Sequence, residues 1–319
     1  MLAAAGVTTV AGCTSFLRRE RDDQSPGGSV TGDGFSNREF GSEATARMVR
    51  YDAANAGAAA TSAGPSGSPT ERWASERTLG SPARPTALAG TVFTNAVNGI
   101  SGFTADGERR WAYDPNGSEL NPAPVAVVGD RLYATRSTAV FALDARTGGE
   151  RWVVEPPVET SRLTAPAVAD DTVYVVGQHP ERAPTLWALA TPDGSVRWRV
   201  ALGGESAGPP VVVDDRAYCV TTNGGLYAVA TGEAAVAWEQ SLEPAVGPPA
   251  ATGDGVFVGT RAGVACYDAD GAERWRASNS TALDSPHDGP VLDDATVYAG
   301  GPGGESLVAL AVDSGEERW

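Results

Sequence analysis

Short runs of apolar residues recur along the chain from about residue 85 to residue 319, and turn-forming residues separate them. In the segment 166–176 (PAVADDTVYVV), Val168 precedes two aspartates, and Val173 and Tyr174 follow them. β-Branched and aromatic residues favour strands, whereas Asp and Gly fit tight hairpin turns. We therefore predict two short strands, A and B, joined by a two-residue turn in this segment.

The hairpin pattern recurs at 124–134, 210–220 and 249–259. A third apolar run follows it, as at 139–144, and a glycine turn then leads into a fourth run that carries Trp, as at 148–154. Four short strands within about 40 residues leave no length for helix pairs. Each unit is therefore predicted to be a sheet of four strands, A to D.

Three markers repeat in one phase along the chain. A Trp recurs at intervals of 37 to 46 residues, a Pro opens each unit, and an aromatic residue follows that Pro after eight or nine residues. A period near 40 made of strands predicts an all-β fold, a β-propeller of four-stranded blades. The markers are Trp73, Trp111, Trp152, Trp198, Trp238, Trp275 and Trp319; Pro85, Pro124, Pro166, Pro210, Pro249 and Pro290; and Phe93, Tyr133, Tyr174, Tyr218, Phe257 and Tyr298.

One segment resembles a known family. ALDARTGGERW (142–152) is similar to the tryptophan-docking motif of the PQQ-like (pyrrolo-quinoline quinone) repeat propellers, and Ala142, Asp144, Thr147, Gly148 and Trp152 match it. Other units match in part, and the resemblance covers roughly residues 48–319. It implies a structural docking role for the seven repeated tryptophans and for the turn glycines, which are Gly148, Gly194 and Gly315.

The number of blades leaves two interpretations open. Six units lie between 85 and 319, and residues 71–73 add a further D strand that carries Trp73. Lipoprotein relatives in the family mostly have eight blades, so we expect an incomplete eight-bladed ring in a chain cut at its C-terminus. The alternative is a closed six-bladed ring with residues 71–79 as a spare strand.

The first residues of the chain resemble an export signal. Residues 2–12 are small and apolar, and VAGC (10–13) fits the lipobox of secreted lipoproteins, in which Cys13 becomes lipidated. The basic region that opens a signal peptide is missing. We predict a signal-peptide remnant with lipobox at 1–13, a disordered tether at 14–66 and the propeller at 67–319.

The charge narrows the class of partner. The formal net charge is −16, all 24 basic residues are Arg, and Ile occurs once. This balance excludes a nucleic-acid surface, and no run of about 20 apolar residues predicts a membrane span. An acidic chain without Lys is typical of extreme halophiles, whose salt screens carboxylate repulsion, so we expect a haloarchaeal source. An acidic, GC-rich mesophile is the alternative.

Residues for catalysis are sparse. The chain has two His, and Cys219 and Cys266 fall on predicted strands of successive blades, where burial is expected and a disulfide is the alternative. The pairs Asp170–Asp171, Asp214–Asp215 and Asp293–Asp294 recur at the A–B turn, which indicates turn residues. His287 stands between Asp284 and Asp288, and a polar loop is favoured there over a metal site.

The resemblance includes quinoprotein dehydrogenases, which carry adjacent cysteines and a set of calcium ligands. The chain has no Cys-Cys pair. We therefore expect no bound PQQ or calcium and a non-catalytic, lipid-anchored extracytoplasmic scaffold that binds a protein or ligand; a fragment of a PQQ-dependent quinoprotein dehydrogenase is the alternative.

Similar bacterial lipoproteins serve the outer-membrane β-barrel assembly machine, but a haloarchaeon has no outer membrane. The expected partner is therefore an envelope protein or glycan, without nucleic acid, and the expected location is the outer face of the cytoplasmic membrane through the lipid anchor alone. The B–C and D–A loops are the expected binding face, and 177–185 is its longest B–C insertion. Its candidate residues are Asn98, Arg136, His179, Arg182, Asn223 and Arg261.

Overall fold

The computed structural model is all-β, and its strands form six antiparallel sheets within the part of the chain that it describes. None of those residues belongs to a helix of the length and apolarity that crossing a membrane requires. The described residues are 71, 73–74, 83–97, 99–114, 123–136, 138–155, 162–179, 181–204, 208–245, 247–278, 289–300 and 307–319.

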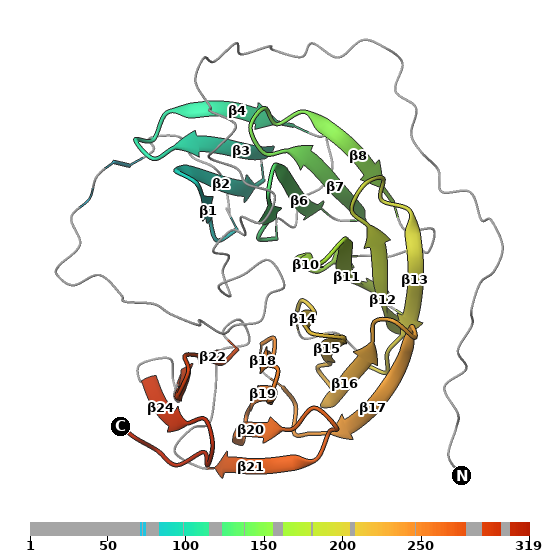
Figure 1. Cartoon of the computed structure of the whole chain (residues 1–319), viewed down its shortest axis with the longest axis vertical. Coiled ribbons are helices and arrows are strands. Elements are labelled where there is room, and N and C mark those ends of the chain that lie inside the picture. Colours follow the sequence, from blue (N-terminus) through green and yellow to red (C-terminus); the bar gives the residue numbers. More distant parts are fainter. Residues whose placement is uncertain are drawn as a thin grey trace.

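The six sheets follow one another around an open arc in chain order, with the first strand of each sheet nearest the centre and the last outermost (Figure 1). We number these sheets as blades 1 to 6 and keep the names A to D for strands from the inside outward. The first and last blades lie on the two sides of the opening. The prediction of a β-propeller built from four-stranded blades is confirmed.

The strand bounds follow the predicted units closely. Blade 1 contains β1 (Thr86–Leu88), β2 (Thr91–Ala96), β3 (Gly99–Thr104) and β4 (Arg109–Tyr113); blade 2 contains β5 (Ala126–Val128), β6 (Arg131–Arg136), β7 (Ala139–Asp144) and β8 (Glu150–Val154). Blade 4 contains β14 (Val211–Val213), β15 (Arg216–Val220), β16 (Gly225–Ala230) and β17 (Ala235–Ser241); blade 5 contains β18 (Ala250–Thr252), β19 (Gly255–Thr260), β20 (Gly263–Tyr267) and β21 (Glu273–Ser278).

Two blades depart from the four-stranded pattern. In blade 3, β9 pairs with β11 as a fifth strand beside the path β10-β11-β12-β13. In blade 6, the place of strand D is taken by a bridge between Leu310 and Glu317 and by the N–H of Arg318, which donates to the carbonyl of Ala309 at 2.8 Å. The strands are β9 (Arg162–Leu163), β10 (Ala167–Ala169), β11 (Thr172–His179), β12 (Arg182–Ala190) and β13 (Val196–Ala201) in blade 3, and β22 (Val291–Leu292), β23 (Thr296–Gly300) and β24 (Leu307–Ala311) in blade 6.

The aspartate pairs lie at tight A–B turns, as the sequence predicts. Ala169 pairs with Thr172 and Val213 pairs with Arg216, so each turn has two residues. Asp170 and Asp214 have φ of +51° and +50° there. Asp tolerates this left-handed region because its short side chain can hydrogen-bond locally.

The core is divided into layers between blades. On β15, Ala217 and Cys219 pack in a cluster with blade 3, whereas Tyr218 and Val220 pack in a cluster with blade 5. A blade inside the arc therefore buries both of its faces. This explains why the strands read as continuous apolar runs and do not alternate with polar residues.

The topology places the connections on two opposite faces. The A–B and C–D turns share one face, and the B–C and D–A loops share the other, because neighbouring strands are antiparallel. Several predictions lie outside the described residues: the lipobox with Cys13, the tether at 14–66, Asn98 and the group around His287.

Candidate functional site

Five of the seven repeated tryptophans bind a turn of the next blade along the chain. The indole Nε1 of Trp111, on blade 1, donates to the carbonyl of Ala145 in the C–D turn of blade 2 at 3.1 Å. The same bond recurs along the arc, at 2.8–3.0 Å, from Trp73 to Ala105, Trp152 to Thr191, Trp238 to Ala269 and Trp275 to Val312. These bonds give the predicted docking role a specific geometry, in which the indole of one blade donates to a turn carbonyl of the next blade.

The turn glycines are needed for two reasons. Gly148 has φ of +70°, which favours glycine over residues with a side chain. A Cβ at Gly148 would also lie 2.5 Å from the indole of Trp111, so the glycine leaves the space that the indole occupies. Gly194, Gly271 and Gly315 have the same relation to Trp152, Trp238 and Trp275. The two repeated positions of Gly-x-x-x-Trp therefore serve different blade contacts. The glycine leaves space for the indole of the preceding blade, and the Trp of the same motif binds a turn of the following blade.

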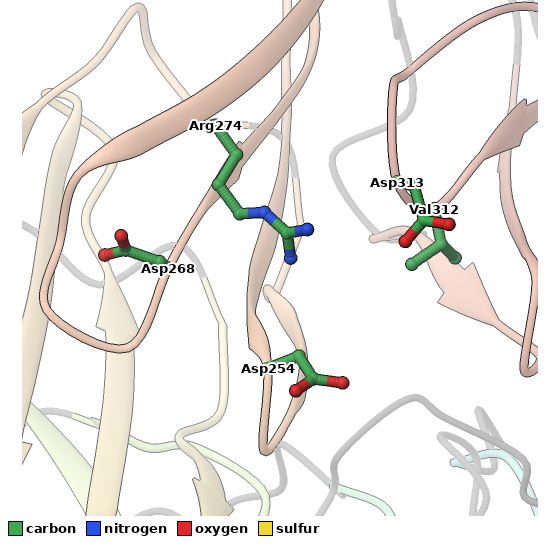
Figure 2. A pocket seen from close by; sticks show the side chains of 5 residues that line it. All are labelled: Asp254, Asp268, Arg274, Val312 and Asp313. Carbon is green, nitrogen blue, oxygen red and sulfur yellow. The ribbon is translucent and has the colours of Figure 1, made fainter.

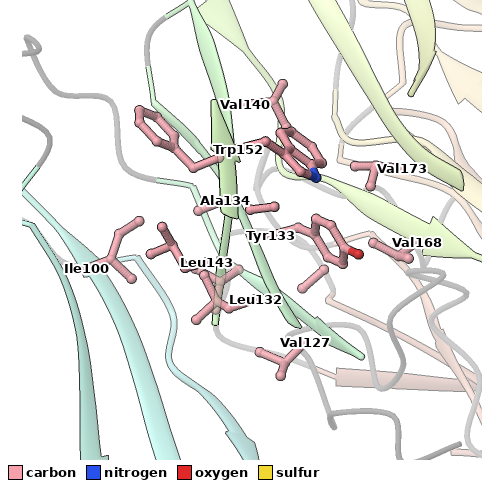
Figure 3. Packing of buried hydrophobic residues seen from close by; sticks show 14 of the residues in the cluster. Ile100, Val127, Leu132, Tyr133, Ala134, Val140, Leu143, Trp152, Val168 and Val173 are labelled. Carbon is pink, nitrogen blue, oxygen red and sulfur yellow. The ribbon is translucent and has the colours of Figure 1, made fainter. Parts of the chain in front are cut away.

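Within each blade the strand-B aromatic packs against the Trp of the same blade. Figure 3 shows Tyr133 and Trp152 of blade 2 facing Val168 and Val173 of blade 3, and the two ring centroids of blade 2 are 6.0 Å apart. Equivalent pairs occur in all six blades at 5.8–6.3 Å. The rings form part of a rigid frame that holds the loops of both faces.

One residue of the predicted binding face is not on its surface. Arg136 was expected on an exposed B–C loop, but it is the last residue of β6 and only 2 % exposed. Its Nη2 donates to the carbonyls of Ala96 and Val97 at 3.0 and 2.9 Å. Burial lowers the pKa of Arg136. That prediction was wrong because the guanidinium satisfies carbonyls at the end of blade 1 instead of facing a partner.

Blade 3 provides the most prominent feature of the B–C face. The predicted insertion 177–185 continues the strands, so β11 has 8 residues and β12 has 9, against five or six in the corresponding strands of the other blades. His179 pairs with Arg182 at the end of this hairpin. His179 is half-buried, and its Nδ1 accepts from the N–H of Glu181 at 3.0 Å, whereas Arg182 is exposed.

Asn223 and Arg261 lie on B–C loops, as the sequence predicts, and both are exposed. Asn223 accepts from the hydroxyl of Thr221 at 2.7 Å and lies against Gly204, where a Cβ would lie 1.8 Å from its Oδ1. The topology therefore brings His179, Arg182, Asn223 and Arg261 to one face of the arc, on three successive blades.

The opposite face carries an open hollow of about 490 Å³ between blades 5 and 6, which sequence reasoning missed (Figure 2). It is lined by Asp254, Asp268, Arg274, Val312 and Asp313. Asp268 accepts the backbone N–H groups of Asp270 and Ala272 at 3.0 and 2.8 Å, which assigns it to its turn. These residues come from three turns and one strand of two blades, so no local sequence signal could have found them.

Among the described residues, the cysteines and acidic side chains are not arranged in the way expected for a quinone cofactor with calcium. Cys219 and Cys266 are free, buried and on different blades, and burial raises the pKa of each thiol to about 12. Within the described ranges, His, Cys, Asp and Glu form no group of three that could hold a metal ion. The donor set therefore does not match adjacent cysteines with a calcium site beside them.

Comparison with known proteins gives a consistent match. A family model described as outer membrane protein assembly factor BamB matches residues 53–163, 96–181 and 136–319. The protein of that name from Yersinia pestis is 30% identical over 208 residues, which cover 58% of this chain and 52% of the relative. The one from Moranella endobia (strain PCIT) is 33% identical over 132 residues, 40% of this chain and 33% of the relative. The chain thus spans about half or less of the length of the curated relatives it matches.

Solved structures show the same fold. The crystal structure of BamB from Moraxella catarrhalis aligns with a TM-score of 0.59 at 22% identity, over 74% of this chain and 71% of that one. Quinohemoprotein alcohol dehydrogenase from Comamonas testosteroni also gives 0.59, at 12% identity, over 86% of this chain and 60% of that one. Because identities this low carry the fold alone, the choice between a binding propeller and an enzyme depends on the residues.

Proposed function

Because the chain belongs to the family of the outer membrane protein assembly factor BamB, we propose that it is a non-catalytic, extracytoplasmic propeller that binds a protein partner of the cell envelope. The observation that carries this proposal is the lengthened β11–β12 hairpin of blade 3, which extends the B–C face. A glycan is the second candidate ligand at the same face.

The hairpin is built to hold a fixed shape. β9 pairs with the inner edge of the hairpin, on β11, through Leu163–Gly177 and Arg162–Gln178. On the outer side, the N–H of Leu202 donates to the carbonyl of Pro184 at 2.8 Å. Both edges of the extension therefore have backbone partners. A preorganised hairpin loses little conformational freedom on binding, which favours affinity.

The charge of the hairpin differs from that of the chain. In a protein of net charge −16, exposed Arg162 on β9 and exposed Arg182 on β12 lie on the two strands that pair with β11 in this extension. Guanidinium groups bind carboxylates through paired hydrogen bonds. We propose that the partner presents acidic side chains to this hairpin and that Asn223 and Arg261 extend the contact toward blades 4 and 5.

The proposed location rests on the sequence. We propose that Cys13 carries a lipid that holds the chain at the outer face of the cytoplasmic membrane, with residues 14–66 as the tether. The BamB relatives are outer membrane assembly factors by name, and the proposal takes from that name only the binding of an envelope protein. Replacing Cys13 by Ser should move the chain from the membrane fraction to the soluble fraction.

Affinity purification with single-charge variants tests the binding face. Tagged wild type in an extract of the native envelope should retain a discrete partner, and Arg182→Glu should reduce its recovery severalfold. Arg109→Glu is the matched control, because Arg109 is an exposed arginine on the outer strand β4 of blade 1 and the charge change is the same. Equal recovery with both variants would exclude the hairpin as the binding element.

Cofactor titration tests the enzymatic alternative. We expect PQQ with calcium to give neither a change in quinone absorbance nor reduction of an electron-accepting dye in the presence of primary alcohols. Saturable absorbance change together with dye reduction would overturn the proposal in favour of a dehydrogenase fragment.

A further inference from the structure

The seam between blades 3 and 4 lacks the indole bond that the neighbouring seams have. In the other four seams between blades 1 and 6, an indole N–H donates to a turn carbonyl of the next blade at 2.8–3.1 Å. Trp198 on β13 is the exception, because its Nε1 has no acceptor among the described residues, although Thr231 of blade 4 corresponds in sequence to Ala145 of blade 2. This seam lies midway along the arc, with three blades on each side (Figure 1).

The C–D turn of blade 4 explains the missing bond. The other five C–D turns have a left-handed glycine where the indole of the preceding strand D packs, whereas blade 4 has Ala234 there, at φ +54°. At the corresponding Gly194 of blade 3, a Cβ would lie 2.8 Å from the indole of Trp152. Because Ala234 carries such a Cβ, it keeps the indole of Trp198 out of the position from which its N–H would reach the carbonyl of Thr231.

On the B–C face the same seam is tightly packed. Two glycines follow β13; a Cβ on Gly203 would overlap the hydroxyl of Tyr227 on β16, and one on Gly204 would overlap the amide of Asn223. Tyr227 is 6 % exposed and packs in one cluster with Leu202 and other apolar residues of blade 3. The seam is therefore held at its B–C face and along its inner strands, but its outer edge at the C–D turn has no indole bond.

We propose that the arc bends at the seam between blades 3 and 4, where the C–D edge opens transiently while the B–C face is the pivot. Local opening occurs where few interactions have to be broken, and each neighbouring seam would have to break an indole bond. Opening at the C–D edge tilts the B–C loops of blades 3 and 4 toward each other. The seam thereby sets the angle between Arg182 and Asn223 of the candidate face. This inference does not depend on the proposed function, because it concerns the chain without a partner.

Two cysteines report on two seams within the same chain. Cys219 on β15 packs in the cluster between blades 3 and 4, and Cys266 on β20 packs in the cluster between blades 5 and 6. Both thiols are free and at most 1 % exposed, so a thiol reagent reaches each of them only when its seam or the whole chain opens. The third cysteine of the chain is removed by Cys13→Ser.

Native-state thiol labelling of the Cys13→Ser protein tests the proposal, with each rate divided by the rate of the same thiol in the unfolded chain. Ala234→Gly gives the indole of Trp198 the space that the other turns provide. We expect it to slow the labelling of Cys219 by about fivefold or more, while Cys266 keeps its rate. Ala235→Gly in β17 is the matched control and should not slow Cys219.

A second measurement compares two seams at one position. Ala134 follows the strand-B Tyr133 as Cys219 follows Tyr218, so it faces blade 1 across the seam that carries the bond of Trp111, and it is 0 % exposed. The thiol introduced by Ala134→Cys, in a Cys219→Ala background, should label about tenfold more slowly than Cys219 does in its own seam.

Three results would overturn the proposal. The first is an equal normalised rate at positions 134 and 219, and the second is an unchanged rate for Cys219 in Ala234→Gly. The third is slowing of Cys219 and Cys266 by the same factor, which would show that labelling follows global unfolding and not the opening of one seam. If Ala134→Cys does not fold, the comparison with Ala234→Gly decides alone.

Discussion

Removing one docking indole measures what holds two blades together. Trp111→Ala empties a seam in which the indole is 6 % exposed, donates to Ala145 at 3.1 Å and packs against Phe93. A buried indole covers about 150–250 Å², which corresponds to roughly 4–6 kcal/mol as an upper estimate. We expect a loss of about 3–5 kcal/mol in the free energy of unfolding, as for other large-to-alanine changes. The assay is equilibrium denaturation at high salt, and Trp319→Ala is the control, with a loss below about 1 kcal/mol because that indole is 62 % exposed.

A double-mutant cycle with Gly148→Ala separates the two roles of the glycine. In the wild-type background this change combines the cost of φ +70°, about 1–2 kcal/mol, with a Cβ placed 2.5 Å from the indole of Trp111. In the Trp111→Ala background the contact disappears and only the backbone cost remains. We therefore expect a coupling energy of about 1 kcal/mol or more. Losses that add within about 0.5 kcal/mol, or equal losses for Trp111→Ala and Trp319→Ala, would refute the seam account.

Three further predictions concern backbone, pH and salt. Ala234 takes the place of the turn glycine in blade 4, at φ +54°. In thermal melts, Ala234→Gly should therefore stabilise the protein by about 1 kcal/mol, whereas the control Ala235→Gly in β17 should destabilise it. The reverse order would contradict the argument that Ala234 is strained. The Arg197 guanidinium lowers the pKa of Asp171, and backbone N–H groups lower that of Asp293. A carboxyl whose pKa is lower in the folded state stabilises the fold at pH values above its unfolded pKa of about 4, and this contribution is lost as the pH falls through the folded pKa. The stability of the protein should therefore be level between about pH 7 and 5 and should decline below about pH 4. Finally, the melting temperature should rise between about 0.1 M and 3 M KCl, because salt screens the net charge of −16, and an unchanged value would remove the halophile hypothesis.

The blade pattern could be predicted because it is local. Each unit holds its own strand signals and turn residues, so the sequence order of apolar runs is also the order of strands in a sheet. The docking partners could not be read in the same way. Gly148 and Trp152 stand four residues apart in one motif, but Gly148 contacts Trp111, 37 residues earlier, and Trp152 contacts the turn of blade 3. Only the arrangement of neighbouring blades in space shows that each of these residues contacts a different repeat.

The candidate face was predicted in part for a similar reason. Exposed Asn223 and Arg261 follow from short, polar B–C connections, which hairpin patterns locate well. Arg182 is also exposed, but it begins β12 in the lengthened hairpin, where the sequence predicts a loop. The burial of Arg136 could not be predicted in this way. A charged residue beside a turn suggests an exposed loop, and the carbonyls of Ala96 and Val97 that accept from Arg136 belong to another blade. The polar hollow is lined by Arg274 of blade 5 and Asp313 of blade 6, among others, so neither repeat carries a sequence signature for it.

Site-specific photo-crosslinking tests whether the chain binds an envelope partner through its B–C face. A photoreactive amino acid replaces Arg182 at the blade 3 hairpin in one variant, and exposed Asp193, in the C–D turn of the same blade on the opposite face, in the other. We expect a discrete crosslinked species in the native envelope from position 182 and none from position 193. Crosslinking from position 193 alone, or equally from both positions, would contradict it.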